Sequence, residues 1–306
     1  MDFTLLDFLI SCGSILLAGF LISEILERTK LLTTSENDPI NSPLNVIIDS
    51  GIDCTNPDDK SESESVVEGS NRLPIDIETR RVAVIELCEP LKWHGYSSQP
   101  VAMTMTNDGS SIVVRSFWSR GVRPRIVGGP LKGSYHFNSI ILNWGLTDDN
   151  GSQHTIDSMR YPLEMQLVHI KAEYDSLEDA IVSKNKESVA IVSFLFEKGD
   201  NDNSTLDPII TNLSRVTDAN TKVYIPPFYL DTLFPLFESK FYSYNGSLAQ
   251  PPYSEIVTWI IQSKLLGVSS FQMAQFRKVH SCGPIINNPR PKLLLNDRDI
   301  YFHELN

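Results

Sequence analysis

The chain has 306 residues, of which 41% are hydrophobic, and its formal net charge is −12 at pH 7. A chain of this length and composition can bury a substantial core in one domain that carries appendages. The sequence shows no cluster of Lys and Arg that could neutralise nucleic-acid phosphates. We therefore expect a folded globular domain that does not bind nucleic acid.

The first 30 residues form an apolar segment. Residues 8–22 carry no charge, and the apolar run that starts at Phe3 is interrupted only by Asp7. A bilayer-spanning helix needs about 20 apolar residues, so the segment is marginally long enough. A cleaved secretory signal is the alternative, but it would start with basic residues and end at a small-residue cleavage site. We expect an uncleaved membrane anchor over residues 1–30.

The charges beside this segment indicate its orientation only weakly. Arg28 and Lys30 follow it and no Lys or Arg precedes it, which favours the cytosolic, reducing side for the rest of the chain. Sequons for N-glycosylation favour the extracellular or luminal side, which stays the alternative, but a chain this rich in Ser and Thr has about three by chance. The sequons start at Asn150, Asn203, Asn212 and Asn245.

The four cysteines form no C-x-x-C pair, so the sequence indicates neither a zinc knuckle nor a disulfide framework. They are Cys12, Cys54, Cys88 and Cys282. We expect Cys88 and Cys282 to be buried thiols, because free cysteine is often found in protein cores.

Residues 31–71 differ in composition from the rest of the chain. They are acidic, rich in Ser and Asn, and contain no aromatic residue. Such a segment buries too little apolar surface to offset its ordering entropy. We expect a flexible spacer there, followed by one domain over residues 72–306. The alternative is that residues 43–52 add a strand to an exposed sheet edge.

Beyond Arg72 the sequence is typical of short strands separated by Gly, Asn, Asp and Pro. The expected strands lie within residues 81–87, 101–116, 139–145, 165–174 and 188–197. Apolar residues recur three and four apart at only two places, residues 176–184 and 206–218, so the sequence indicates helices there. The pattern predicts a mainly β, antiparallel domain with a few surface helices.

Several motifs occur in a fixed order along the domain. They read "LPIDI", "NDGSS", "GGPLKGSYHF", "NWG", "GSQHTID", "EMQLVHIKAEY", "YNGSLAQPPYSEIVTW", "VSSFQMAQFRKV" and "NNPRPKLLL". In this order they make the chain from about Arg72 to Phe302 resemble the α-class carbonic anhydrases. The resemblance implies one domain built around a large, twisted, mostly antiparallel sheet with few helices.

The resemblance also implies a specific chemistry, which is hydration of CO2 at a zinc ion held by three histidines. The metal lowers the pKa of its bound water to about 7. Two of these ligands come from an H-x-H-W-G strand, in which a spacing of two puts both side chains on one face. The matching residues here are Ile141 and Asn143, and the third ligand position falls on Gln166. A hydrocarbon and two neutral amides are poor zinc ligands, so we expect no metal, no cofactor and no catalytic residue.

Other positions around the site also depart from the family pattern. The threonine that accepts a hydrogen bond from zinc-bound hydroxide and the glutamate that holds it are matched by Ala249 and Gln153. Gln250 occupies a position where the family usually has a second threonine. Ser110 occupies the position where the family has the histidine that shuttles protons. Glu164 matches the carboxylate that polarises a ligand imidazole. With Leu248, these residues would line a vestigial pocket.

We therefore expect a catalytically inactive carbonic-anhydrase-related protein, tethered to a membrane, that uses the fold to bind or assemble with an unidentified protein partner. Two alternatives remain open at this point. One is an enzyme with esterase-like chemistry that uses Glu164 and His169. The other is a binder of anions or small molecules in a pocket lined by Ile141, Leu248 and Ala249.

Overall fold

The computed structural model describes residues 75–87, 89–119, 123–234, 240–250, 252–280 and 299–304. The expected anchor, the spacer with its possible added strand, and all four cysteines lie outside these ranges. Among the residues that the structure describes, no helix is both long and apolar enough to cross a membrane.

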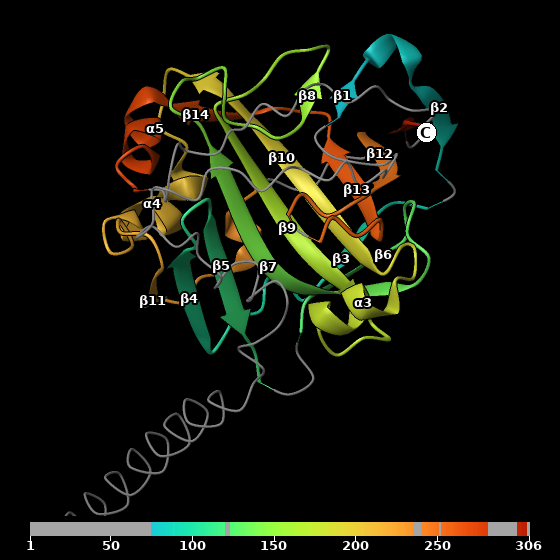
Figure 1. Ribbon diagram of the computed structural model, residues 1–306, viewed down its shortest axis with the longest axis horizontal. Helices are drawn as coiled ribbons and strands as arrows, with labels where there is room; N and C mark the ends of the chain where they lie inside the picture. Colours follow the sequence, from blue (N-terminus) through green and yellow to red (C-terminus); the bar gives the residue numbers. More distant parts are fainter. Residues whose placement is uncertain are drawn as a thin grey trace, which may run out of the picture.

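A thirteen-stranded twisted sheet forms the body of the domain (Figure 1). Its path runs through β11 (Thr221–Ile225), β4 (Ala102–Asn107), β5 (Ile112–Phe117), β7 (Ser134–Trp144), β9 (Leu163–Lys171), β10 (Val189–Gly199), β13 (Val257–Gln262), β12 (Phe241–Gly246), β15 (Tyr301–Glu304) and β2 (Ala83–Glu86). Three further strands join this path at its sides, namely β3 (Lys92–His94), β6 (Arg125–Val127) and β14 (Leu266–Ser269).

Most neighbouring strands are antiparallel, as the sequence predicts. Strand β10 is parallel to β13 and β14, and β15 is parallel to β2. A separate two-stranded parallel sheet joins β1 (Asp76–Ile77) to β8 (Thr155–Ile156). Each of the five expected strand regions overlaps at least one strand, and residues 101–116 cover most of the hairpin of β4 and β5. The mainly β fold class is confirmed.

Both faces of the sheet are covered, because alternate residues of the central strands belong to two separate apolar clusters. Leu167 of β9 packs in one cluster, while its neighbour Val168 packs in the other. We call the side of Val168 the pocket face and the side of Leu167 the opposite face. Burial on both sides explains why β9 and β10 are largely continuous runs of buried residues.

Helices are short and lie around the sheet (Figure 1). The two expected helices are present as α3 (Leu177–Ser183) and α4 (Asp207–Leu213), with the 3-10 turns η2 (Thr79–Arg81), η3 (Ser204–Leu206) and η4 (Leu230–Thr232). The apolar periodicity did not indicate α5 (Ser270–Phe276), which is a third helix among the described residues. Its signal is a capping box between Ser269 and Gln272 rather than an apolar period, which seven residues are too few to display.

Candidate functional site

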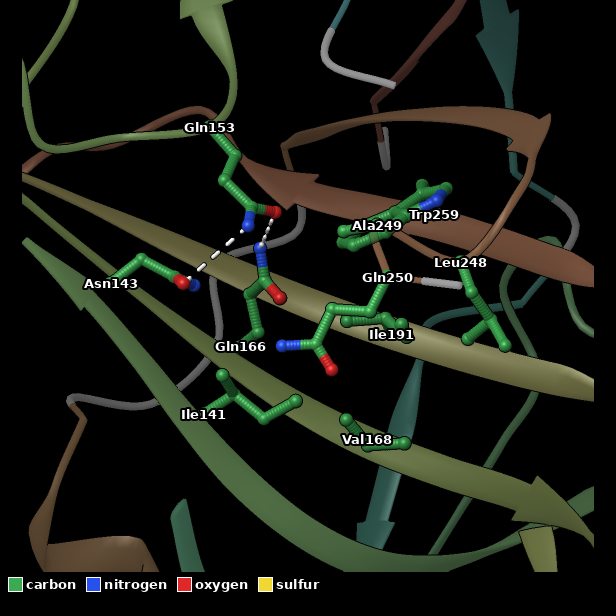
Figure 2. Close-up of a pocket in the computed structure, with 10 residues that line it drawn as sticks. All are labelled: Ile141, Asn143, Gln153, Gln166, Val168, Ile191, Leu248, Ala249, Gln250 and Trp259. Carbon is green, nitrogen blue, oxygen red and sulfur yellow. Dashed lines mark hydrogen bonds between the residues drawn. The ribbon is translucent and has the colours of Figure 1, made fainter. Parts of the chain in front are cut away.

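The pocket is built on two neighbouring central strands. Ile141 and Asn143 stand two residues apart on β7, so their side chains share a face. Gln166 on β9 is the direct Cα partner of Ile141. All three side chains line one pocket on the pocket face (Figure 2). The structure therefore brings together the three residues that sequence comparison placed at the ligand positions.

Seven more residues complete the lining of this pocket. They are Gln153, Val168, Ile191, Leu248, Ala249, Gln250 and Trp259. None of the ten lining side chains is an imidazole, a thiolate or a carboxylate. The cavity has a volume of about 20 Å³, which is on the order of the space that one ordered water needs. The enclosed free space among these residues is therefore small.

A chain of amide hydrogen bonds connects three of the four amide side chains of the pocket, those of Asn143, Gln153 and Gln166 (Figure 2). The Gln153 Nε2 donates to Asn143 Oδ1 at 3.4 Å, and the Gln166 Nε2 donates to Gln153 Oε1 at 3.0 Å. The same Gln166 nitrogen donates to Glu164 Oε1 at 2.8 Å. Both N–H groups of Gln166 are therefore committed to protein partners. Among the described residues, Asn143 Nδ2 is buried without a hydrogen-bond partner.

Glu164 lies beneath this chain and is fully buried. Its Oε1 also accepts from His154 Nδ1 at 2.7 Å and from Ser193 Oγ at 2.8 Å. Its Oε2 accepts the main-chain N–H groups of Gln153 and His154 at 2.7 and 3.0 Å. Burial alone would raise the pKa of this carboxyl, but His154 and the other donors outweigh burial and lower the pKa to about 2. Glu164 is thus an ionised, fully hydrogen-bonded anchor.

Two of the predicted vestigial pocket residues do not line the pocket. Glu164 accepts a hydrogen bond from Gln166 but does not itself line the pocket. Ser110 lies in the turn between β4 and β5, where its hydroxyl and its main-chain N–H both donate to Asp108 Oδ1. A position at the end of a hairpin gives Ser110 no contact with the amide chain.

The proposed catalytic pair of the esterase-like alternative is not assembled. Glu164 and His169 are five residues apart on the regular strand β9, so their side chains point to opposite faces of the sheet. His169 is buried among aromatic rings and hydrogen bonds to Tyr96. Burial lowers the pKa of its imidazole to about 3, so it is neutral. These two residues cannot act on one substrate.

Sequence reasoning missed three apolar residues of the pocket, Val168, Ile191 and Trp259. Val168 could have been found, because it stands two residues after Gln166 on the same strand. Ile191 and Trp259 are direct partners on β10 and β13, which only the strand order reveals. Trp259 is held by a hydrogen bond from its Nε1 to the Ser247 carbonyl at 3.1 Å.

The described residues contain no group of three or more His, Cys, Asp or Glu side chains that could hold a metal ion. His154 contacts Glu164 in this network, and both of its ring nitrogens are engaged. Its Nδ1 bonds to Glu164, and its Nε2 is 2.7 Å from the Tyr244 hydroxyl. His154 therefore has a structural role in this arrangement.

Comparison with known proteins identifies the fold. Residues 56–304 match the sequence model of the family described as eukaryotic-type carbonic anhydrase. The chain belongs to this family. Carbonic anhydrase 3 of Homo sapiens is 28% identical over 248 residues, which cover 79% of this chain and 93% of that protein. Carbonic anhydrase 1 of Monodelphis domestica is 30% identical over 233 residues, which cover 74% of this chain and 84% of that protein.

The family membership that the sequence motifs predict is thus confirmed. Several of the retained carbonic anhydrase motifs have structural roles in the core or in turns. Trp144 and Trp259 are both in the core, and the "GGPL" turn has Gly128 at φ 80° with the Pro90 carbonyl 2.5 Å from where a Cβ would stand. A side chain at Gly128 would collide with the main chain, so the turn requires glycine.

Proposed function

We propose that this carbonic anhydrase family member does not hydrate CO2 and serves as a binding or assembly module. The observation that carries the proposal is the side-by-side placement of Ile141, Asn143 and Gln166. By the sequence motifs, these positions correspond to the three histidines that hold zinc in the family.

The residues present do not fit a zinc ion. Ile141 has no lone pair, and neutral amide oxygens suit hard cations rather than zinc. The side-chain nitrogen of Gln166 would take the place of a ligand nitrogen. It uses both of its hydrogens to bind Glu164 and Gln153. Without the metal, nothing in the pocket lowers the pKa of a water to near neutrality. No step of CO2 hydration can be derived for this pocket.

The size of the cavity supports a role outside the pocket. A site for a small organic ligand usually has a volume of about 300 Å³ or more, whereas this cavity holds about 20 Å³. Leu248 and Gln250 line the same cavity as Ile141 (Figure 2). The cavity therefore gives no support to the alternative of a small-molecule binder. A protein partner that binds the outer surface fits these dimensions better.

CO2 hydration by the purified full-length protein tests the proposal. After incubation with zinc, stopped-flow measurement is expected to give the rate of buffer alone. Carbonic anhydrase 3, measured in parallel under the same conditions, serves as the positive control. A rate well above buffer that a Gln166→Ala variant loses would overturn the proposal.

The proposal includes a tether to the membrane through residues 1–30, with the domain on the cytosolic side. Its support is the uncharged run at residues 8–22 and the basic residues Arg28 and Lys30 after it. The full-length chain should stay in the membrane fraction after an alkaline wash, and a Leu16→Glu/Leu17→Glu variant should be released. Release of the unaltered chain would contradict the tether.

Glycosylation tests the cytosolic orientation separately. Asn245 starts a sequon and is exposed, whereas Asn212 starts another and is 9% exposed. A domain in the lumen would carry a glycan at Asn245, and a glycosidase would shift its mobility. We expect no shift.

Pull-down through the C-terminus in mild detergent, followed by mass spectrometry, would then identify the partner, with a Val182→Lys variant as a surface control.

A further inference from the structure

A larger pocket lies on the opposite face of the sheet. Its volume is about 430 Å³, which is within the range of about 300 to 1,000 Å³ that is typical of small-molecule sites. Ser243 of strand β12 is one of the residues that line it. On the same strand Phe241 packs in the apolar cluster of the opposite face, and Tyr242 packs in that of the pocket face. Ser243 is two residues from Phe241, so its side chain also lies on the opposite face.

Neighbouring strands of the sheet bring the polar groups of this pocket together (Figure 1). Thr258 on β13 is the direct partner of Asn245 on β12. Ser243 is the direct partner of Tyr301 on β15. All four residues line the pocket, together with His303 of β15. Because residues paired in register have neighbouring side chains, strand geometry holds these groups in place.

Ser243 and His303 form a hydrogen-bonded pair in this pocket. The Ser243 Oγ is 2.6 Å from His303 Nε2, a distance at which an imidazole can take the proton of a nucleophilic hydroxyl. The two residues are only 3% and 4% exposed, although both line the pocket. Burial lowers the pKa of His303, so its imidazole is neutral at neutral pH and can accept a proton. The pair therefore has the parts of a nucleophile and its general base.

The ring of His303 is held by packing and not by a carboxylate. In a Ser-His-Asp triad the acid orients the imidazole and stabilises the imidazolium that forms. Here the ring stacks on Phe241, with ring centroids 4.8 Å apart and an angle of 26° between the planes. Among the described residues, His303 Nδ1 is buried without a hydrogen-bond partner. Stacking fixes the orientation of the ring but stabilises its charged form less than a carboxylate would, so His303 is a well-placed but weak base.

A weak base restricts the substrates to those with a good leaving group. A thiol ionises with a pKa of about 8.5, far below the pKa of an alkyl alcohol. A thioester therefore expels its thiolate with little help from a general acid, whereas an alkyl ester or an amide needs a proton on the leaving group. The reaction that fits this pair is acyl transfer from a thioester.

Asn245 supplies a donor for the charge that develops on the acyl oxygen. It stands two residues after Ser243 on β12, so the two side chains share a face. Its Oδ1 accepts a hydrogen bond from Thr258 Oγ1 at 3.3 Å, and its Nδ2 has no hydrogen-bond partner among the described residues. A side-chain amide N–H beside the nucleophile can stabilise an oxyanion.

We propose that Ser243 and His303 hydrolyse small acyl thioesters in this pocket. As Ser243 Oγ bonds to the acyl carbon, its proton passes to His303 Nε2, and Asn245 Nδ2 donates to the acyl oxygen. The C–S bond then breaks, and the leaving thiolate takes the proton from His303. A water next gives a proton to His303 and bonds to the acyl carbon. The bond to Ser243 breaks, its Oγ regains the proton, and the products are a thiol and a carboxylic acid. The pair lies across the sheet from Gln166, so the proposal does not depend on whether the chain hydrates CO2.

Hydrolysis of S-acetyl-N-acetylcysteamine by the purified full-length protein tests the proposal, with the released thiol measured by a thiol-reactive dye. The unaltered chain is expected to release thiol faster than buffer, and a zinc chelator should leave the rate unchanged. Ser243→Ala and His303→Gln should reduce the rate to that of buffer, and Asn245→Ala should slow it at least about 10-fold. Circular dichroism verifies that each variant folds.

Ser263→Ala is the matched control. The Ser263 Oγ donates to the Lys240 carbonyl at 2.8 Å, and Ser263 does not line the pocket. This variant should keep the full rate. Two outcomes would overturn the proposal, namely a rate for the unaltered chain that equals that of buffer and a folded Ser243→Ala variant that keeps the rate.

Covalent labelling tests the nucleophile in the unaltered chain, without a substitution that could disturb the fold. A fluorophosphonate reacts irreversibly with a serine hydroxyl that a neighbouring base activates. After incubation and proteolysis, mass spectrometry should find the adduct on the peptide that contains Ser243 and not on the peptide that contains Ser263. Labelling of Ser243 that does not exceed labelling of Ser263 would contradict the assignment of Ser243 as the nucleophile.

Discussion

Gln166 donates its side-chain N–H to Glu164 Oε1 over 2.8 Å, between alternate residues of strand β9. A metal-ligand histidine commonly donates one ring N–H to such a carboxylate and keeps the lone pair of its other nitrogen for the metal. The amide of Gln166 makes the same donation, but its second N–H goes to Gln153. In this chain Glu164 therefore supports an amide side chain and not an imidazole.

Glu164 should be important for stability. Replacing it with Gln leaves several of the donors around the carboxylate facing an amide N–H instead of an acceptor, and all of them are buried. We expect Glu164→Gln to lower the free energy of unfolding by about 3 kcal/mol or more, measured by urea denaturation. The exposed Glu89→Gln is the control and should change it by less than about 0.5 kcal/mol. Similar losses in the two variants would contradict the role assigned to Glu164.

The strand geometry should still support a metal once ligands are supplied. The triple variant Ile141→His/Asn143→His/Gln166→His places three imidazoles around one point of the pocket. We expect it to bind zinc in calorimetry, with the melting temperature rising on zinc addition. Adding Glu164→Gln to the triple variant should weaken zinc binding by about 10-fold to 100-fold. A triple variant that folds but does not bind zinc would show that the backbone positions themselves have moved.

Gly151 should tolerate no side chain. A Cβ at this position would lie 1.8 Å from the Pro162 carbonyl oxygen, which is main chain and precedes β9 directly. The turn also carries Gln153 and His154, so a shift would disturb their bonds to Glu164. We expect Gly151→Ala to destabilise the fold by at least about 2 kcal/mol in urea denaturation. Gly267 is the control, because nothing lies within 4 Å of its Cβ position. Equal effects of the two substitutions would refute this expectation.

The neutral, buried His169 should make the fold sensitive to mild acid. Its pKa is about 3 in the folded chain against 6.5 as the ordinary value, so the unfolded chain binds the proton first as the pH falls. The contribution of neutral His169 to the free energy of unfolding is complete above pH 6.5. It is lost as the pH falls toward 3, by about 1.4 kcal/mol per pH unit. Urea denaturation from pH 6.5 to 4.5 should show a shallower dependence in His169→Gln.

Glu164 does not interfere in that interval of pH. Its pKa is lowered from 4.5 to about 2, so its contribution to stability is lost only below about pH 4.5. Burial also lowers the pKa of His303. Because both proteins contain His303, its contribution to the pH dependence of stability is the same in both. The same pH dependence in the variant and the unaltered chain would mean that His169 is not the titrating group.

Much of the fold could be predicted from sequence because its signals are local or repeated. Alternation with a period of two put Ile141 and Asn143 on one face, and β7 has them there. The fragment "VSSFQMAQF" lacks such repetition, since α5 is held by a cap and by buried Met273 and Phe276. Short helices of this kind depend on tertiary contacts more than on their own pattern.

The interior of the site could not be predicted in the same way. The amide chain joins Gln153 in the loop before β8 to Asn143 on β7 and Gln166 on β9. The direction of each amide depends on partners from other elements. The same is true of the cavity volume, because Trp259 and Ile191 reach the pocket only through the order of strands β10 and β13. The failure of Glu164 and His169 to meet, by contrast, follows from their odd spacing on one strand.

Zinc stoichiometry is the most direct test of the central claim, that the pocket of this carbonic anhydrase family member cannot hold the metal. The measurement is equilibrium dialysis of the full-length protein against zinc, followed by elemental analysis by mass spectrometry. We predict no zinc bound at the pocket, and no difference between the unaltered chain and Gln166→Ala. One zinc per chain that Gln166→Ala or Asn143→Ala removes would contradict the account.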